Sequence, residues 1–237
     1  MLIEYDEIMK SFYKNTKNSL KYGLKDKKVI LILGLMYFLS SFVNKFDAHP
    51  NILKLVNLFL LFIIGYGSYI TWTTVNNIDE LPDIKKYREI IWEGFKKSLI
   101  LLIYTLIITY LIHCFLYYHI INPVLSSIYL ILALLTYLIL IVGLINRTIN
   151  YGNILKSFDL KEIVELMIKF DKKILIKVII AALMGQIISI ISYIDIHPGF
   201  TLTEAFITVL SLILTPILYI TTKRLIGIHI GQLLEKK

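Results

Sequence analysis

The chain has 237 residues, of which 57% are hydrophobic and only 18% are charged. A soluble domain of this length would carry more polar residues between its apolar ones, so the composition excludes an ordinary soluble protein. The formal net charge of +8 can indicate a nucleic-acid-binding protein. Here the basic residues are spread along the whole chain, with no separate soluble segment to carry a binding surface, so nucleic acid is not an expected partner.

Six apolar segments follow one another along the chain, and most approach the roughly 20 residues that a helix needs to cross a bilayer. Since a backbone inside lipid must satisfy its own hydrogen bonds, each segment is expected to be a helix. The sequence therefore predicts an all-α polytopic integral membrane protein, with a single transmembrane domain over residues 1–237 and six transmembrane helices as three hairpins. The predicted spans are residues 29–43, 52–75, 98–118, 124–145, 174–194 and 202–222.

Basic residues are distributed unevenly between the two sides of these spans. The connections on one side, together with both chain ends, hold 22 Lys and Arg residues, and the connections on the other side hold only Lys45. The positive-inside rule assigns the basic side to the cytoplasm. The N-terminal segment 1–28 and the tail 223–237 are therefore expected to be cytoplasmic, in a multi-pass protein of the cell (plasma) membrane. The same basic side predicts contact with anionic lipid.

Amphipathic stretches precede three of the spans on the cytoplasmic side. Residues 84–95 carry apolar side chains at helical spacing and are predicted to lie in the headgroup plane, with Trp92 at the interface. A similar stretch begins at Asp159 and Glu162, which match a capping box. The N-terminal segment is a weaker third copy. The two clearer apolar faces comprise Ile84, Tyr87, Ile91, Trp92 and Phe95, and Leu160, Ile163, Val164, Met167 and Phe170.

Short sequence motifs recur at matching places. The tetrapeptide TVNN at Thr74 precedes FKKSL at Phe95, and TINY at Thr148 precedes FDKKIL at Phe170. The chain therefore reads as three units of one orientation, each a surface helix followed by a transmembrane hairpin. Parallel internal repeats of this kind occur in transporters, and they also arise when a stable hairpin is simply duplicated.

Several of these stretches resemble one uncharacterised family. The dipeptide Gly65-Tyr66, then ELPD, WEGFKKSLILLIY, KSFDLKEI and the closing KRLIGIHIG, resemble the family labelled "domain of unknown function 4013". The resemblance runs from about Gly65 to the end of the chain. The family comprises multi-pass membrane proteins from archaea and bacteria, so the resemblance implies that architecture and implies no activity and no catalytic residue.

Signatures of membrane enzymes are absent from the sequence: there is no zinc-protease, nucleophile-elbow or phosphate-loop motif. The spans hold no Asp or Glu in their central thirds, which counts against a proton- or sodium-coupled transporter. Asn57, Gln186 and Thr215 lie deep in the spans and are candidates for a polar path, although such residues more often bond across packed helices. A G-x-x-x-G motif at Gly227 and Gly231 falls beyond the last span, where it predicts little.

A D-x-H-P motif occurs in two of the predicted outer loops. Imidazole and carboxylate groups are ligands for zinc and related divalent ions, and loops this short must lie near one another. The competing interpretation is that Asp and Pro simply form tight turns. The candidate metal ligands are Asp47, His49, His119, Asp195 and His197.

These patterns favour a non-catalytic membrane protein, a scaffold or partner with lipid-surface helices. Its expected partners are membrane lipids, including anionic lipid at the cytoplasmic face, and either another membrane protein or further copies of the chain. No cofactor is expected unless the outer loops hold a metal. The alternative is a transporter or channel for an unidentified solute, and an enzyme is the least favoured class.

Overall fold

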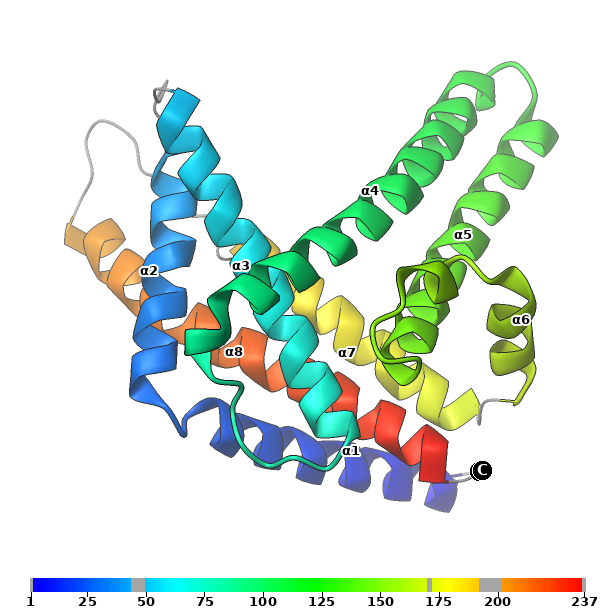
Figure 1. The fold of residues 1–237 in the computed structure, drawn as a ribbon. Coiled ribbons are helices and arrows are strands. Elements are labelled where there is room, and N and C mark those ends of the chain that lie inside the picture. Colours follow the sequence, from blue (N-terminus) through cyan, green and yellow to red (C-terminus); the bar gives the residue numbers. More distant parts are fainter. Residues whose placement is uncertain (1, 44–49, 170–171, 192–201, 236–237) are drawn as a thin grey trace. The chain divides into compact units, whose positions relative to one another are not determined.

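The computed structural model describes residues 2–43, 50–169, 172–191 and 202–235, and these ranges contain helices and no strands (Figure 1). The all-α prediction is confirmed for this part of the chain. Two short 3-10 helices, η1 (Ile84–Lys86) and η2 (Ile154–Ser157), precede α4 and α6. The α-helices are α1 (Leu2–Gly23), α2 (Lys27–Val43), α3 (Pro50–Val75), α4 (Tyr87–Tyr118), α5 (Pro123–Ile149), α6 (Leu160–Lys169), α7 (Lys172–Ile191) and α8 (Leu202–Glu235).

Among the described residues, four helical segments are long and apolar enough to cross a membrane. They are Lys54–Val75, Ile84–Tyr118, Pro123–Ile149 and Leu210–Leu234. These segments overlap the second, third, fourth and sixth predicted spans. The first and fifth predicted spans overlap α2 and α7, which are helices as well. Apolar helices of this length identify a membrane protein.

The helices form two compact units. Unit 1 comprises Met1–Gly94 and Asp171–Lys237, and unit 2 comprises Phe95–Phe170. In unit 1, α8 is the central helix, because it packs against α1, α2, α3 and α7. The helix α1 lies across the ends at which α2 begins and α3 ends (Figure 1).

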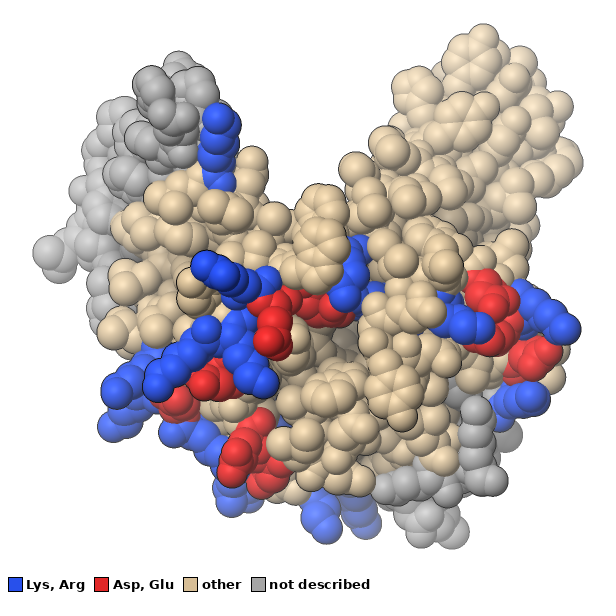
Figure 2. Space-filling view, in the orientation of Figure 1, with Lys and Arg blue, Asp and Glu red and all other residues tan. Residues whose placement is uncertain are grey.

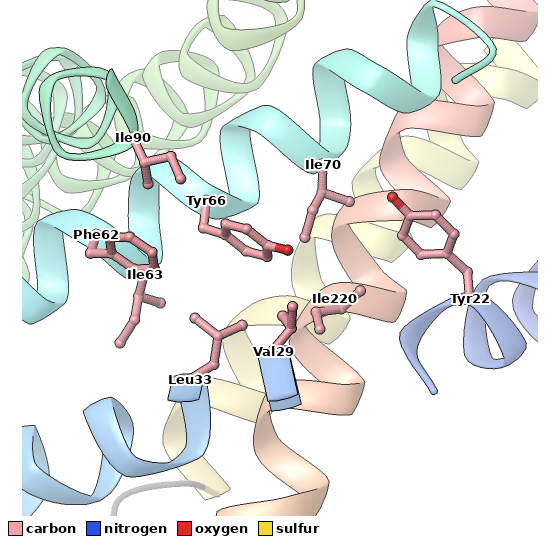
Figure 3. Close-up of a cluster of buried hydrophobic side chains, with 9 residues drawn as sticks. All are labelled: Tyr22, Val29, Leu33, Phe62, Ile63, Tyr66, Ile70, Ile90 and Ile220. Atoms are coloured by element: carbon pink, nitrogen blue, oxygen red, sulfur yellow. The ribbon is translucent and has the colours of Figure 1, made fainter. Parts of the chain in front are cut away.

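Nine buried apolar or aromatic side chains form the core of unit 1 (Figure 3). Two tyrosines of this core also anchor the segment between α3 and η1: Tyr66 donates a hydrogen bond to the Pro82 carbonyl at 3.0 Å, and Tyr22 donates one to the Glu80 carbonyl at 3.0 Å. The core therefore fixes that segment against both α1 and α3. Its members are Tyr22, Val29, Leu33, Phe62, Ile63, Tyr66, Ile70, Ile90 and Ile220.

Two helices are longer than the hydropathy pattern predicts. The stretch 84–95 was predicted to form a surface helix separate from the span 98–118, but after η1 a single helix α4 runs from Tyr87 to Tyr118. The tail likewise continues α8 as far as Glu235. The reason is that Lys96 and Lys97, before one apolar stretch, and Arg224, after another, are strong helix formers, so nothing in the backbone stops the helix there. The third surface helix, α6, is separate as predicted.

The G-x-x-x-G motif lies at a close helix contact. An ideal Cβ at Gly227 would fall 2.8 Å from the Thr71 carbonyl oxygen, so only glycine allows α8 to approach α3 this closely. From the sequence alone this motif predicts little, because it lies beyond the last predicted span. Its role becomes visible once α8 is seen to continue past Thr222.

Unit 2 is built around α5, which packs against η2 and α6. The helix α5 begins with Asn122, whose side chain accepts from the Leu125 N–H, followed by Pro123 in the first turn. The Tyr104 hydroxyl donates a hydrogen bond to the Ser157 carbonyl at 2.8 Å, and its ring stacks on Phe158 with 5.5 Å between centroids. These contacts hold η2 against α4.

The backbone supports the internal repeat. The last residue of TVNN, Asn77, has φ 58°, and the last residue of TINY, Tyr151, has φ 53°. Six residues after Asn77, and two after Tyr151, the side chains of Asp83 and Asn153 cap η1 and η2 in nearly identical conformations. The two copies therefore share a left-handed residue after a long helix and an Asx-capped 3-10 turn.

Candidate functional site

Basic side chains gather in unit 1 over α1 and the neighbouring ends of α2 and α4 (Figure 2). Acidic side chains lie among them in the same view. In unit 1 this surface lies at the ends where α2 and α4 begin. The exposed basic residues of this surface are Lys10, Lys14, Lys17, Lys21, Lys25, Lys27, Lys28, Lys85, Lys86 and Arg88.

The helix α1 has two different faces. Its inner face packs on α8 and includes Ser19 and Tyr22, which are 0% and 1% exposed. Its outer face carries the four lysines at positions 10, 14, 17 and 21, which recur at helical spacing. Tyr13 and Leu24 lie on the same side and are 70% and 51% exposed. The outer face is thus both basic and partly apolar, which suits an anionic, partly apolar surface such as a lipid headgroup layer.

Four residues from three segments form a cluster that we name the Asp79 clasp: Tyr22, Lys25, Asp79 and Arg224. The Lys25 ammonium lies 3.1 Å from Asp79 Oδ2 and donates a second bond to the Asp79 carbonyl at 3.0 Å. The Arg224 guanidinium pairs with Asp79 Oδ1 and lies 3.8 Å from the centre of the Tyr22 ring. The clasp joins the end of α1, the segment after α3 and the middle of α8.

The charges of the clasp act on its carboxylate. Hydrogen bonds from Arg224 and then Lys25 lower the pKa of Asp79 below its usual range. Burial raises the pKa of the Tyr22 hydroxyl, and the nearby Arg224 charge partly opposes that shift. Because the Asp79 side chain is 68% exposed, the ion pairs are screened by water, and pairs of this kind stabilise a fold by about 0–1 kcal/mol. The clasp is therefore a positioning contact and a weak one.

The α1–α8 pair also contains buried polar atoms that lack a hydrogen-bond partner within the described ranges. On α1 these are Nδ2 of Asn15 and Oγ of Ser19, and on α8 they are Nε and Nη1 of Arg224 and Nε2 of His229. His229 is 0% exposed, stacks on Phe12 with 5.7 Å between ring centroids, and pairs its Nδ1 with Gln232 at 3.1 Å. A buried polar group without a partner is costly, so this contact is less favourable than an apolar one of equal area.

Unit 2 holds a second charged cluster, around Lys156. Asn146 donates to the Lys156 carbonyl and to Glu162 Oε2, both at 2.9 Å. The Lys156 ammonium lies 3.1 Å from Asp159 Oδ2 and also pairs with Glu162. These partners raise the pKa of Lys156, Glu162 contributing most, and Lys156 in turn lowers the pKa of Glu162. The cluster fixes η2 and α6 to the end of α5.

The predicted capping pair is confirmed in one direction. Asp159 Oδ1 accepts from the Glu162 N–H at 3.2 Å, as a capping box requires. The Glu162 carboxylate turns instead to Asn146 and Lys156. On α6, Ile163 and Leu166 are buried, while Leu160 and Val164 of the predicted lipid-facing side are 58% and 49% exposed. Periodicity fixes which residues share a face and not which of two apolar faces meets α5.

The predicted metal ligands lie mostly outside the described residues. Asp47, His49, Asp195 and His197 fall in the ranges 44–49 and 192–201. His119 lies in the turn between α4 and α5, where its ring contacts Phe115 with 5.6 Å between centroids. Within the described ranges, no group of three His, Cys, Asp or Glu side chains could hold a metal ion.

Two of the three side chains of the predicted polar path are described. Asn57 is exposed on α3, and Thr215 is 7% exposed on α8. The side chain of Gln186 lies outside the described part of α7.

Sequence reasoning missed the Asp79 clasp. Asp79 and Arg224 are 145 positions apart in the chain, and although Arg224 lies in the stretch KRLIGIHIG, nothing in the sequence pairs it with Asp79. The sequence offers one signal, the basic pair Lys223 and Arg224 at the end of the last predicted span, and the positive-inside rule interprets that pair only as a marker of topology.

The comparisons with known proteins give one match. A family model described as "Protein of unknown function (DUF4013)" matches residues 52–197, which is more than half of the chain. The match begins before Gly65 and ends at His197, so it includes the second predicted hairpin in full and the first and third only in part, and it omits α1 and α8. No curated protein and no solved structure matches the chain.

Proposed function

The chain belongs to the DUF4013 family of proteins of unknown function, and we propose that it is a non-catalytic scaffold of the cell membrane. In this proposal the chain crosses the bilayer six times as three hairpins, with both termini in the cytoplasm. Its basic cytoplasmic surface binds anionic lipid headgroups and holds a partner, either another membrane protein or a further copy of the chain.

One observation carries the proposal. The helix α1 packs its inner face on α8 and turns four lysines outward, beside the ends at which α2 begins and α3 ends. The positive-inside rule places such ends in the cytoplasm, where anionic lipids attract basic residues by about 1 kcal/mol each near the surface. The charged outer face of α1 supports binding of anionic headgroups, and such binding requires no catalytic group.

Lipid binding is tested with purified protein in mixed vesicles. The protein should enrich phosphatidylglycerol over phosphatidylcholine in the lipid that co-purifies after mild detergent extraction. A triple variant, Lys10→Gln with Lys17→Gln and Lys21→Gln, should reduce that enrichment. Lys54→Gln is the matched control, because Lys54 is exposed at the opposite end of α3. Equal lipid composition for wild type and the triple variant would reject the lipid-binding role.

The six-span topology has its own test. Single cysteines at Asn18 and Asn51, in a Cys114→Ala background, should label oppositely with an impermeant reagent on intact cells. Asn18 is exposed on α1, so its accessibility reports the side of the membrane and not burial. Equal labelling at the two sites would reject the topology.

A transporter or channel is the second candidate, and α8 favours it. The apolar segment Leu210–Leu234 contains Lys223 and His229, and ionisable groups inside a spanning helix commonly mark an ion or substrate pathway. His229 is fully buried, as such a group would be in a bundle interior. Solute flux in reconstituted vesicles that is lost in His229→Gln would support this candidate, and a tight vesicle would favour the scaffold.

A further inference from the structure

The contact between α1 and α8 combines extensive packing with poor hydrogen bonding. Five of the eight buried polar atoms that lack a partner in the described ranges belong to these two helices. Two of the residues concerned, Ser19 and His229, are fully buried. A permanent helix interface normally satisfies such groups or replaces them by apolar ones. The seat of α1 on α8 is therefore weaker than its buried area suggests.

The clasp at the C-terminal end of α1 is also easily opened. The Lys25 and Asp79 side chains are 48% and 68% exposed, so salt and competing ions reach the pair. The helix α2 packs on α3 and α8 through contacts of its own, so α2 remains anchored whether or not α1 is seated. Only α1 and Lys25, which lies in the short turn between Gly23 and Lys27, would have to move.

The composition of α1 fits a second seat. Its inner face carries Phe12 and Tyr22, and its flanks and outer face carry lysines. A helix with aromatic side chains on one face and lysines on the others lies stably at an anionic bilayer surface, with the aromatic rings at headgroup depth. On α8 the same rings are already in use: Phe12 stacks on His229, and Tyr22 lies beneath Arg224.

We propose that α1 is an exchangeable strap whose inner face is seated on α8 or on an anionic bilayer surface, and never on both. The proposal rests on the lipid-binding role proposed above and assigns it to one helix and one conformational change. Anionic lipid binds only the released form through that face, so it shifts the population toward release. Release uncovers the α8 surface at Arg224 and His229, which then becomes available to a partner or a solute.

The exchange is measured on the full chain by the distance between two spin labels. Labels at Lys14→Cys, on the outer face of α1, and Asn76→Cys, just after α3, are placed in a Cys114→Ala background. Both positions are exposed, so the labels do not disturb packing. In phosphatidylcholine vesicles the pair should give one narrow distance. In vesicles rich in phosphatidylglycerol a longer distance should become the major population, and high salt should reverse the change.

Three variants make the test specific. A label pair at Asn57, on α3, and Asn76, one residue past its end, should give the same distance in every lipid, because the helix that joins them is rigid. Asp79→Asn should increase the released population at a given lipid composition, since it removes the charge that holds Lys25 and Arg224. Lys10→Gln with Lys17→Gln and Lys21→Gln should decrease it.

The outcomes separate the strap from the scaffold role. An unchanged Lys14–Asn76 distance in anionic vesicles, in a protein that still enriches phosphatidylglycerol, overturns the strap and leaves lipid binding intact. Absence of phosphatidylglycerol enrichment in the wild-type protein overturns the lipid-binding role. A distance change that is identical in the triple-lysine variant also overturns the strap, because it would show that lysine contacts do not drive release.

Discussion

Gly65 on α3 and Gly94 on α4 lie opposite one another where the two helices cross. An ideal Cβ at Gly65 would fall 1.8 Å from the Ile90 carbonyl oxygen, and one at Gly94 would fall 1.8 Å from the Leu61 carbonyl oxygen. The obstacles are backbone atoms, which cannot rotate away as a side chain can. This pair therefore sets the distance at which α4 passes α3, and it positions η1 and the preceding clasp segment.

Replacing either glycine by alanine should destabilise unit 1. We expect Gly65→Ala and Gly94→Ala each to lower the free energy of unfolding by about 1–3 kcal/mol, because the backbones must separate to admit a methyl group. The measurement is thermal unfolding of the detergent-solubilised protein, followed by tryptophan fluorescence.

The control is another glycine of a helix interior. At Gly231 on α8 the nearest atom to an ideal Cβ is 3.8 Å away, so Gly231→Ala meets no obstacle. It should stabilise the helix by up to about 1 kcal/mol. If all three variants behave alike, the close crossing of α3 and α4 is not present in solution.

Asp79 should make the stability depend on pH in the acid range. Its pKa is lowered in the folded protein by Arg224 and Lys25, so the carboxylate contributes stability above its unfolded pKa of about 4. That contribution is lost as the pH falls through the lowered folded pKa. We expect Asp79→Asn to be less stable than wild type by at most about 1 kcal/mol at neutral pH, and equally stable in strong acid.

Glu80→Gln removes the neighbouring carboxylate and serves as the control, since Glu80 contributes its backbone carbonyl to Tyr22. In Glu80→Gln the pH dependence assigned to Asp79 should remain. A pH-independent difference for Asp79→Asn would contradict the assigned ion pairs.

Tyr151 should be replaceable by glycine with a gain in stability. Its φ of 53° is unfavourable for a residue with a Cβ, and its side chain is 86% exposed, so little packing is lost. We expect Tyr151→Gly to raise the free energy of unfolding by about 0.5–1 kcal/mol. Asn77→Gly should give a smaller gain, because asparagine tolerates this conformation better. A loss of stability at Tyr151 would mean that its ring makes contacts in the membrane.

Local features of the fold can be predicted from the sequence, and contacts between distant segments cannot. The apolar segments, the cap at Asp159 and the repeat of TVNN as TINY depend on neighbouring residues, and each has its structural counterpart. The meeting of Gly65 with Gly94, and of Asp79 with Arg224, depends on how helices cross, and no periodicity encodes that.

The ends of helices were predicted less well for a different reason. Hydropathy falls at Lys96 and at Lys223, whereas helix propensity does not, so α4 and α8 run on through these charges. His229, which the sequence placed in a tail, is for the same reason a buried residue of α8. The hydropathy pattern predicts which residues are apolar enough to be buried, whereas helix propensity predicts where a helix can continue. A helix end predicted from one of them alone is unreliable where the two disagree.

The outer-loop metal site stays a prediction. Replacing His49 and His197 together by alanine should abolish stoichiometric zinc, cobalt or nickel in the purified protein. Binding should weaken as the pH falls through about 6.5, because metal binding needs neutral imidazoles. His113 is the control, since it is exposed on α4 and belongs to neither D-x-H-P motif. If the wild-type protein holds no metal and shows no thermal shift with one, these residues only form turns.

Trp92 should report the depth of the start of α4. It is 60% exposed, and α4 continues from it without a break to Tyr118. In a Trp72→Phe background, Trp92 fluorescence should be quenched most strongly by lipids brominated at shallow depth, as expected for an indole at the headgroup level.

A second variant, Trp92→Phe with Leu106→Trp, moves the indole 14 residues along the same helix, or about 21 Å at 1.5 Å per residue. Leu106 is 62% exposed, so its replacement should be accommodated, and quenching should be strongest with deeply placed bromines. Equal depth at the two positions would show that α4 lies along the surface over this length, and quenching of Trp92 by aqueous iodide alone would place it outside the bilayer.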